Sequence, residues 1–67
     1  MVNIWDFANT LPELEIETVD GEKFLGKVVA VFDAEESGEE QDNLSLELSD
    51  GRIVSFFPSE IRFVYER

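Results

Sequence analysis

The chain contains two Asp-Gly pairs, Asp20-Gly21 and Asp50-Gly51, and each pair separates two stretches that are rich in apolar residues. Glycine accepts the positive φ angle that a tight turn between antiparallel strands requires. In the segment before each pair, apolar and polar residues alternate. A period of two indicates a strand with one buried and one solvent-facing side. We therefore expect a fold based on two β-hairpins.

Five short strands follow from this pattern, because apolar stretches recur between turn signals along the chain. Their expected bounds are 13–18, 23–32, 44–48, 52–57 and 61–65. The chain leaves no room for crossover helices, so the strands form an antiparallel sheet. The long second strand is apolar on both faces and contains Gly26, where we expect a bend. The predicted fold is mainly β, a small five-stranded, strongly bent antiparallel barrel whose closure hides the strand edges.

A short N-terminal helix is predicted over residues 3–11. Apolar residues recur there at i, i+3, i+4 and i+7, on one helix face: Ile4, Phe7, Ala8 and Leu11. Asn3 is a favourable N-cap, and Pro12 disfavours helix at the residue before it. A helix this short is unstable alone, so its apolar face must pack on the sheet. Residues 58–60 similarly predict a single 3₁₀ turn before the last strand.

The length of 67 residues corresponds to one domain, with an N-terminal helix and linker at 1–12 and a barrel at 13–67. The sequence contains no cysteine and no histidine. Disulfides, Cys-ligated zinc and thiol catalysis are thereby excluded, and the commonest general base and metal ligand are absent. The domain must be stabilised by its aromatic residues or by oligomerisation.

Sixteen acidic residues and five basic residues give the chain a net charge of −11. Nucleic-acid binding usually depends on Lys and Arg that neutralise phosphates, so this composition makes nucleic acid an unfavourable partner. An anionic membrane would repel the chain for the same reason. A basic protein partner, or solubility alone, is consistent with the charge.

No apolar stretch in the sequence has the length of a transmembrane helix. The first six residues lack the basic segment and apolar core that begin a secretory signal. Together with the absence of cysteine, this predicts a cytoplasmic location.

The sequence resembles the Sm-like (LSM) family in two motifs. The first is Leu14-x-Ile16-x-x-x-Asp20-Gly21-x-x-x-x-Gly26-x-Val28 followed by Asp33, and the second is Ser59-Glu60-Ile61-x-x-Val64. The Ile4-Trp5-Asp6 start, the acidic middle and the Phe56-to-Ile61 segment are most similar to small uncharacterised LSM-domain-like proteins of bacteria and phages. The resemblance implies a short helix followed by a five-stranded Sm-like/SH3-like barrel. It also implies rings in which the fourth strand pairs with the fifth strand of the next subunit.

The RNA-binding residues of that family are not present at the matching positions. Typical members have an aromatic residue or His two residues after the motif Asp, and an Asn two residues later. Here Asp33 is followed at these positions by Glu35 and Ser37. Phe57 and Pro58 stand where the second motif usually has Arg and Gly. The uridine-binding pocket of the family is therefore not expected.

The acidic loop at 33–43 loosely matches the start of a calcium-binding loop, with the glycine at its sixth position: Asp33, Glu35, Ser37, Gly38 and Glu39. The twelfth position, which should be a bidentate Glu, is Leu44, so we expect no specific metal site and no cofactor. The alternative is a flexible solvated loop. Most carboxylates lie at positions predicted to be exposed, so we do not expect an enzyme.

Three groups of residues are candidates for an interaction surface. Trp5 and the Phe56-Phe57 pair form an apolar patch unless one ring fills the core and the other packs on the helix. The last strand offers an apolar edge with Ile61, Phe63 and Tyr65. The acidic loop offers four glutamates to a basic partner: Glu35, Glu36, Glu39 and Glu40.

The predicted function is a protein-interaction or self-association module, in which the acidic surface steers a basic partner. Mutual repulsion of copies with a charge of −11 favours a monomer or small oligomer over a full ring. Two alternatives remain open at this point, an RNA-binding Sm-like ring and an acidic mimic of nucleic acid.

Overall fold

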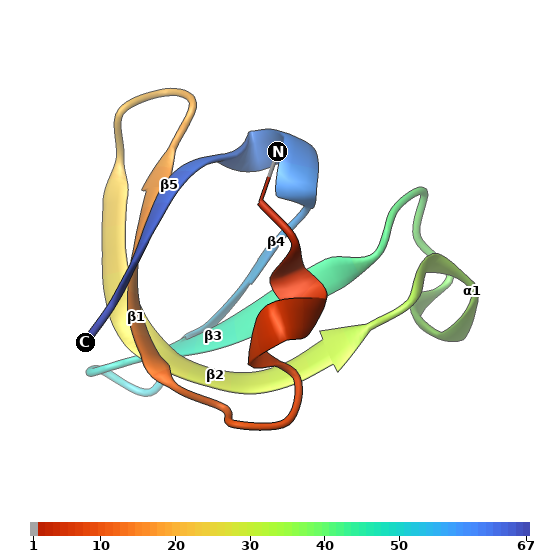
Figure 1. Ribbon diagram of the computed structural model, residues 1–67, viewed down its shortest axis with the longest axis horizontal. Helices are drawn as coiled ribbons and strands as arrows, with labels where there is room; N and C mark the ends of the chain where they lie inside the picture. The colour runs from red at the N-terminus through yellow and green to blue at the C-terminus, as the bar shows by residue number, and fades with distance from the viewer. Residues whose placement is uncertain (1) are drawn as a thin grey trace.

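The five predicted strands are present and form one antiparallel sheet in the computed structural model, which describes residues 2–67 (Figure 1). Met1, the first residue of the predicted N-terminal segment, lies outside the described residues. The sheet order is β4-β3-β2-β1-β5. The elements are η1 (Ile4–Phe7), β1 (Glu13–Thr18), β2 (Lys23–Phe32), α1 (Ala34–Ser37), β3 (Asn43–Leu48), β4 (Ile53–Phe56), η2 (Pro58–Glu60) and β5 (Ile61–Glu66).

Both predicted hairpin turns are confirmed, and they share one backbone geometry. In the first turn, Thr18 N donates to Glu22 O at 2.8 Å and Gly21 N donates to Thr18 O at 2.9 Å. Leu48 and Gly51 make the equivalent bonds in the second turn, at 2.8 and 2.9 Å. Gly21 and Gly51 have φ angles of 87° and 88°. This is a three-residue loop whose last residue is left-handed, the conformation that explains why glycine ends each turn.

The long strand β2 changes the face that it presents to the core halfway along its length. Its pairing with β3 shifts register between Val28 and Ala30, so one residue on β2 is left without a partner. A bulge of one residue moves every following side chain to the opposite face. Val28 is fully buried before the shift, whereas Val31 packs on the core after it and Phe32 is 40% exposed. The bulge therefore explains why the sequence of this strand is apolar on both faces.

Gly26, where a bend was predicted, lies in regular register, opposite Leu14 on β1 and Leu48 on β3. Its structural role is a close approach between strands. A Cβ atom at this position would lie 2.3 Å from the backbone oxygen of Glu47. Only glycine allows β2 and β3 to approach this closely.

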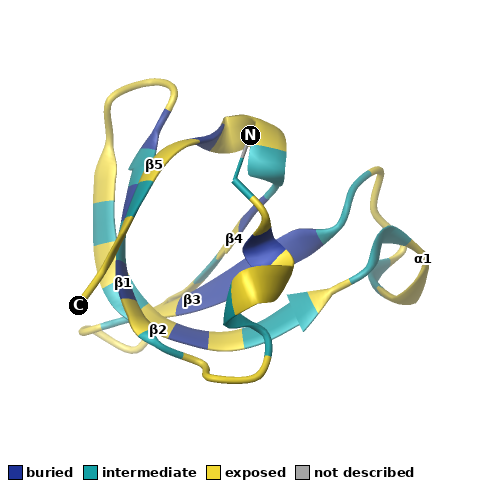
Figure 2. Cartoon of the chain, in the orientation of Figure 1, coloured by how far each residue is buried: buried dark blue, intermediate teal, exposed yellow. Residues whose placement is uncertain are grey.

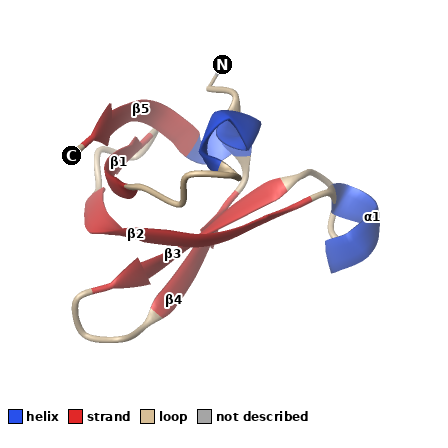
Figure 3. Cartoon of the chain, turned by 60° about the horizontal axis from the view of Figure 1, so that its bottom comes forward, coloured by secondary structure: helices blue, strands red, loops and turns tan. Residues whose placement is uncertain are grey.

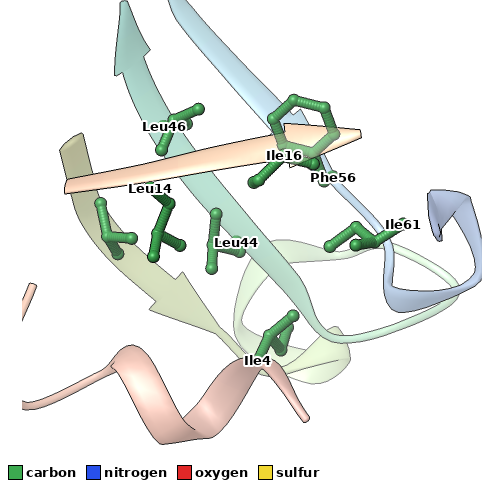
Figure 4. Packing of buried hydrophobic residues seen from close by; sticks show 8 residues of the cluster. Ile4, Leu14, Ile16, Leu44, Leu46, Phe56 and Ile61 are labelled. Carbon is green, nitrogen blue, oxygen red and sulfur yellow. The ribbon is translucent and has the colours of Figure 1, made fainter. Parts of the chain in front are cut away.

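The core lies inside the curve of the sheet (Figures 2 and 4). Full burial of each large aliphatic side chain contributes roughly 1.5–3 kcal/mol. Phe24 on β2 meets Phe56 edge-on, with ring centroids 5.3 Å apart, and this contact links β4 to the first hairpin. The buried apolar residues are Ile4, Leu14, Ile16, Val28, Leu44, Leu46, Phe56 and Ile61.

The predicted N-terminal helix is present, but it is shorter than the expected span of residues 3–11. It is a 3₁₀ helix of four residues, Ile4–Phe7, followed by a turn. Leu11 has a φ angle of 47° and Pro12 follows it, so the chain leaves the helix to enter β1. The predicted N-cap is confirmed, because the side chain of Asn3 accepts a hydrogen bond from Trp5 N at 3.2 Å. The short helix still contributes Ile4 to the core.

The sheet is strongly curved but not closed (Figures 1 and 3). Strands β4 and β5 are the two ends of the sheet order and do not pair with each other among residues 2–67. Instead β5 pairs with β1, from Leu14 opposite Glu66 to Thr18 opposite Ile61. The predicted closure that would hide both edges is therefore not observed. None of the helices in the described part of the chain is long and apolar enough to cross a membrane.

The close contact at Gly26 predicts a strong effect of a single methyl group. We expect Gly26→Ala to lower the free energy of unfolding by more than about 3 kcal/mol, because the new Cβ overlaps backbone atoms. Gly51→Ala is the matched control, since its Cβ meets open space and costs only the left-handed conformation, about 1–2 kcal/mol. Urea unfolding measures both variants. Equal losses would contradict the close-approach explanation.

Candidate interaction site

The acidic loop, residues 33–43, was predicted to be a loop throughout, but it contains the one-turn helix α1. Asp33 caps α1, and its side chain accepts from Glu36 N at 2.7 Å. Gly38 ends the turn with a φ angle of 72°. An Asp three residues before a Glu, followed by glycine, is a helix start and stop signal that the sequence interpretation missed.

Asp42 attaches the acidic loop to the N-terminal 3₁₀ helix. One carboxylate oxygen accepts from the indole Nε1 of Trp5 at 2.8 Å, and the other accepts from Ala34 N at 2.8 Å. The hydrogen bond from Trp5, and then that from Ala34, hold the pKa of Asp42 below its ordinary value. Trp5 was predicted as part of an apolar patch. Its indole N–H is bound to Asp42, and the residue is 42% exposed.

The structure divides the predicted aromatic and apolar candidates into two groups. Phe56 and Ile61 are 3% and 6% exposed and belong to the core, so their side chains are not available to a partner. Phe63 and Tyr65 are 46% and 51% exposed, with ring centroids 6.3 Å apart. Phe57 is half-buried and lines a pocket that is described below. The exposed part of the predicted apolar surface therefore consists of Trp5 and the two aromatic residues on β5.

The four glutamates predicted for a basic partner are all exposed: Glu35, Glu36, Glu39 and Glu40. Residues 2–67 contain no group of three acidic side chains placed to hold a metal ion. In the loose calcium match, Asp33 acts as a helix cap and Ser37 donates to the backbone oxygen of Asp33 at 3.1 Å. The acidic loop is thus organised by its own hydrogen bonds.

The two edge strands leave backbone groups unpaired. Hydrogen-bonded and non-bonded pairs alternate along antiparallel strands. Because Leu48 N donates to Arg52 O, the backbone groups of Ile53 and Ser55 on β4 point away from β3. By the same alternation, the bond from Arg67 N to Glu13 O turns the backbone groups of Val64 away from β1. Both edges can therefore accept a further strand.

A pocket of about 280 Å³ lies between the acidic loop and the connection from β4 to β5. Its apolar lining comes from Phe32 and Phe57, and its charged lining comes from Glu39 and Glu60. A hydrogen bond of 3.1 Å from Gln41 Nε2 to the hydroxyl of Ser59 ties the two sides together. We name this the Phe32–Phe57 pocket; its remaining lining residues are Ser37, Asn43, Ser45 and Ser55.

Polar side chains on β3 form the floor of the Phe32–Phe57 pocket. Asn43 and Ser45 lie on the face opposite the core, yet they are only 5% and 7% exposed. Ser45 was predicted to face solvent. It is buried because the acidic loop folds over this face, where the amide nitrogen of Asn43 donates to Ser37 Oγ at 2.9 Å. The hydroxyls of Ser45 and Ser55 lie 3.2 Å apart in register.

Positive charge is absent from the middle of the sequence. No Lys or Arg occurs between residues 28 and 51, a segment that includes the whole acidic loop. Lys27 stands in register between Glu13 on β1 and Glu47 on β3, and Arg67 forms an ion pair with Glu15. Lys27 and Arg67 thus lie beside carboxylates of the sheet, and the acidic loop has no basic residue of its own.

The contact between Asp42 and Trp5 predicts an acid-induced change in tryptophan fluorescence. Because the folded pKa of Asp42 is lowered, its stabilising effect is complete above the unfolded pKa and is lost as the pH falls through the folded value, below about pH 4. We expect the emission of Trp5 to change in that window and Asp42→Asn to abolish the change.

Asp50→Asn provides the control, since hydrogen bonds from the backbone and side chain of Arg52 also lower the pKa of Asp50, in the second turn. It should lower the free energy of unfolding at neutral pH and reduce the part of it that is lost in acid, without altering the emission of the folded protein. An unchanged fluorescence titration in Asp42→Asn would contradict the assignment.

Compared with known proteins, the chain matches no family model, no curated protein and no solved structure. The functional proposals below therefore depend on the geometry and charge of the described residues.

Proposed function

We propose that this protein is an interaction module that associates through the edges of its open sheet. The observation that carries this proposal is the sheet order, in which β4 and β5 are terminal strands with outward-facing backbone groups. An uncovered edge pairs readily with another strand, because main-chain hydrogen bonds supply affinity and side chains supply specificity. The β4 edge of one copy and the β5 edge of another are the proposed partners.

The side chains on β5 support association at this edge. Phe63 and Tyr65 are exposed large aromatic residues, and the guanidinium of Arg62 lies 5.4 Å from the ring centre of Phe63. Aromatic residues and Arg are enriched at protein interfaces relative to the rest of the surface. Ile53, 54% exposed, gives the β4 edge an apolar side chain as well. The two edges therefore offer compatible surfaces.

The fold proposed for this module is an Sm-like/SH3-like barrel left open between β4 and β5. The two-motif resemblance and the strong curvature of the sheet support it. The charge of −11 and the carboxylates around the Phe32–Phe57 pocket argue against the RNA binding of that family. The proposed protein acts in the cytoplasm, binds a protein partner, holds no cofactor and catalyses no reaction.

The acidic loop supplies a second contact, with a basic partner. Its exposed carboxylates have no basic neighbour in sequence, so they attract positive charge over the distance set by ionic screening. Self-association and binding of a basic protein then have opposite salt dependences. Salt screens the repulsion between acidic copies and strengthens self-association, but it weakens attraction to a basic partner.

Ile53→Pro tests association through the β4 edge. Proline removes the outward N–H at the first residue of β4 and leaves the bonds to β3 intact. We expect the wild type to form oligomers whose mass, measured by light scattering, increases between about 0.05 M and about 0.5 M salt. Ile53→Pro should remain a monomer throughout.

Ile53→Thr is the matched control, because it keeps the outward N–H and a β-branched side chain and should still associate. Circular dichroism and thermal unfolding establish that both variants fold. A wild type that is monomeric at every salt and protein concentration would overturn edge association, and so would an Ile53→Pro protein with the same oligomer mass as the wild type.

A further inference from the structure

The Phe32–Phe57 pocket has a lining whose chemistry specifies its ligand. We propose that it binds the guanidinium group of an arginine side chain presented by a basic protein partner. This inference rests on the proposed function as an interaction module, and it concerns the acidic loop rather than the strand edges. Four features of the pocket support it: its charge, its hydrogen-bond acceptors, its aromatic lining and its size.

The charge of the lining selects a cation. Glu39 and Glu60 line the pocket, and none of its lining residues is Lys or Arg. Glu60 is held in place, because one of its carboxylate oxygens accepts from Phe57 N at 2.9 Å. Its second carboxylate oxygen remains for a ligand. Two carboxylates beside a pocket repel phosphate and attract a positively charged group.

Asn43 places an open acceptor in the floor of the pocket. The hydroxyl of Ser37 has one proton, which it donates to Asp33 O at 3.1 Å, so it must accept from the amide nitrogen of Asn43. This assignment fixes the orientation of the amide. The amide oxygen of Asn43 then accepts no hydrogen bond from any residue in 2–67, although the residue is only 5% exposed. No buried side-chain N or O atom in these residues lacks a partner, so this oxygen is open to the pocket and can accept from a ligand or from water.

The serine pair adds further acceptors. One hydroxyl of the Ser45–Ser55 pair donates to the other at 3.2 Å, and each oxygen keeps lone-pair capacity. A guanidinium carries five N–H donors in a planar fork and no acceptor. The pocket, with two carboxylates, an amide oxygen and two hydroxyls, is complementary to that pattern.

The aromatic lining favours arginine over lysine. Phe32 and Phe57 come from the end of β2 and the residue after β4, and both line the same cavity. A flat guanidinium stacks on aromatic rings and is more weakly hydrated than an ammonium, so it loses less hydration on entering the pocket. The volume of about 280 Å³ lies at the lower end for ligand sites, which fits one side chain.

The test is an NMR titration of the ¹⁵N-labelled protein with Nα-acetyl-argininamide. We expect millimolar binding with the largest shifts at the side-chain amide of Asn43 and the backbone amides of Ser45 and Phe57. Nα-acetyl-lysinamide has the same charge and should bind at least about threefold more weakly, because its ammonium group cannot stack on the aromatic rings or donate hydrogen bonds as a planar fork. Nα-acetyl-citrullinamide, which has the same shape without charge, should not bind.

Neighbouring glutamates supply a matched pair of variants. Glu39 lines the pocket and Glu40 does not, although both are exposed and both substitutions remove one charge from the same loop. Glu39→Gln should weaken acetyl-argininamide binding about threefold, and Glu40→Gln should leave it within about 1.5-fold. Phe57→Leu keeps an apolar side chain but removes the ring, and should abolish the preference for arginine over lysine.

Several outcomes would overturn the proposal. Equal effects of Glu39→Gln and Glu40→Gln would show diffuse attraction to the acidic loop instead of a pocket. Shifts confined to the backbone amides of the exposed glutamates would also overturn the proposal, and so would binding of uridine monophosphate in place of acetyl-argininamide. Failure of this test leaves the proposal of edge association intact, because edge association is measured by oligomer mass. Conversely, a monomeric protein that binds acetyl-argininamide at Asn43 would support the pocket proposal and overturn edge association.

Discussion

The burial of β3 on both faces is the constraint on which most of the structure depends. Leu44 and Leu46 fill the core on one side, while Asn43 and Ser45 are covered on the other. β3 also pairs with β2 and β4 along its two edges. A strand enclosed on all sides can carry buried polar side chains only if they are hydrogen-bonded. The bond from Asn43 to Ser37 meets that requirement and folds the acidic loop back onto the sheet.

Local features of the fold were predictable because they depend on neighbouring residues. The turns at Gly21 and Gly51, the N-cap at Asn3 and the alternation along β1 need only sequence neighbours to form. The N-terminal helix was not predictable in the same way. Its periodicity is helical, but the need to bury Ile4 and turn at Leu11 into β1 restricts it to a 3₁₀ turn.

The candidate site was predictable in charge but not in shape. The acidic loop and its excess of carboxylates are evident from composition, and so is the exposed aromatic edge of β5. The pocket depends on contacts between distant segments, such as Gln41 with Ser59 and Asp42 with Trp5. The assignment of Phe56 and Phe57 to core and pocket required the register of β4, which places Phe56 opposite Leu44. No single stretch of sequence contains that information.

The position of β5 has a consequence for how the chain folds. The two hairpins join strands that are adjacent in sequence, so their closure requires ordering only short loops. β5 completes the sheet by pairing with β1, from the opposite end of the chain. We therefore expect this non-local pairing to form late, after the hairpins. Until it forms, the free edge of β1, with the glutamates Glu15 and Glu17 along it, must itself resist premature strand pairing. Charges on an edge strand are one of the means by which proteins prevent such pairing, which gives the acidic alternation of β1 a role during folding as well as in the finished sheet.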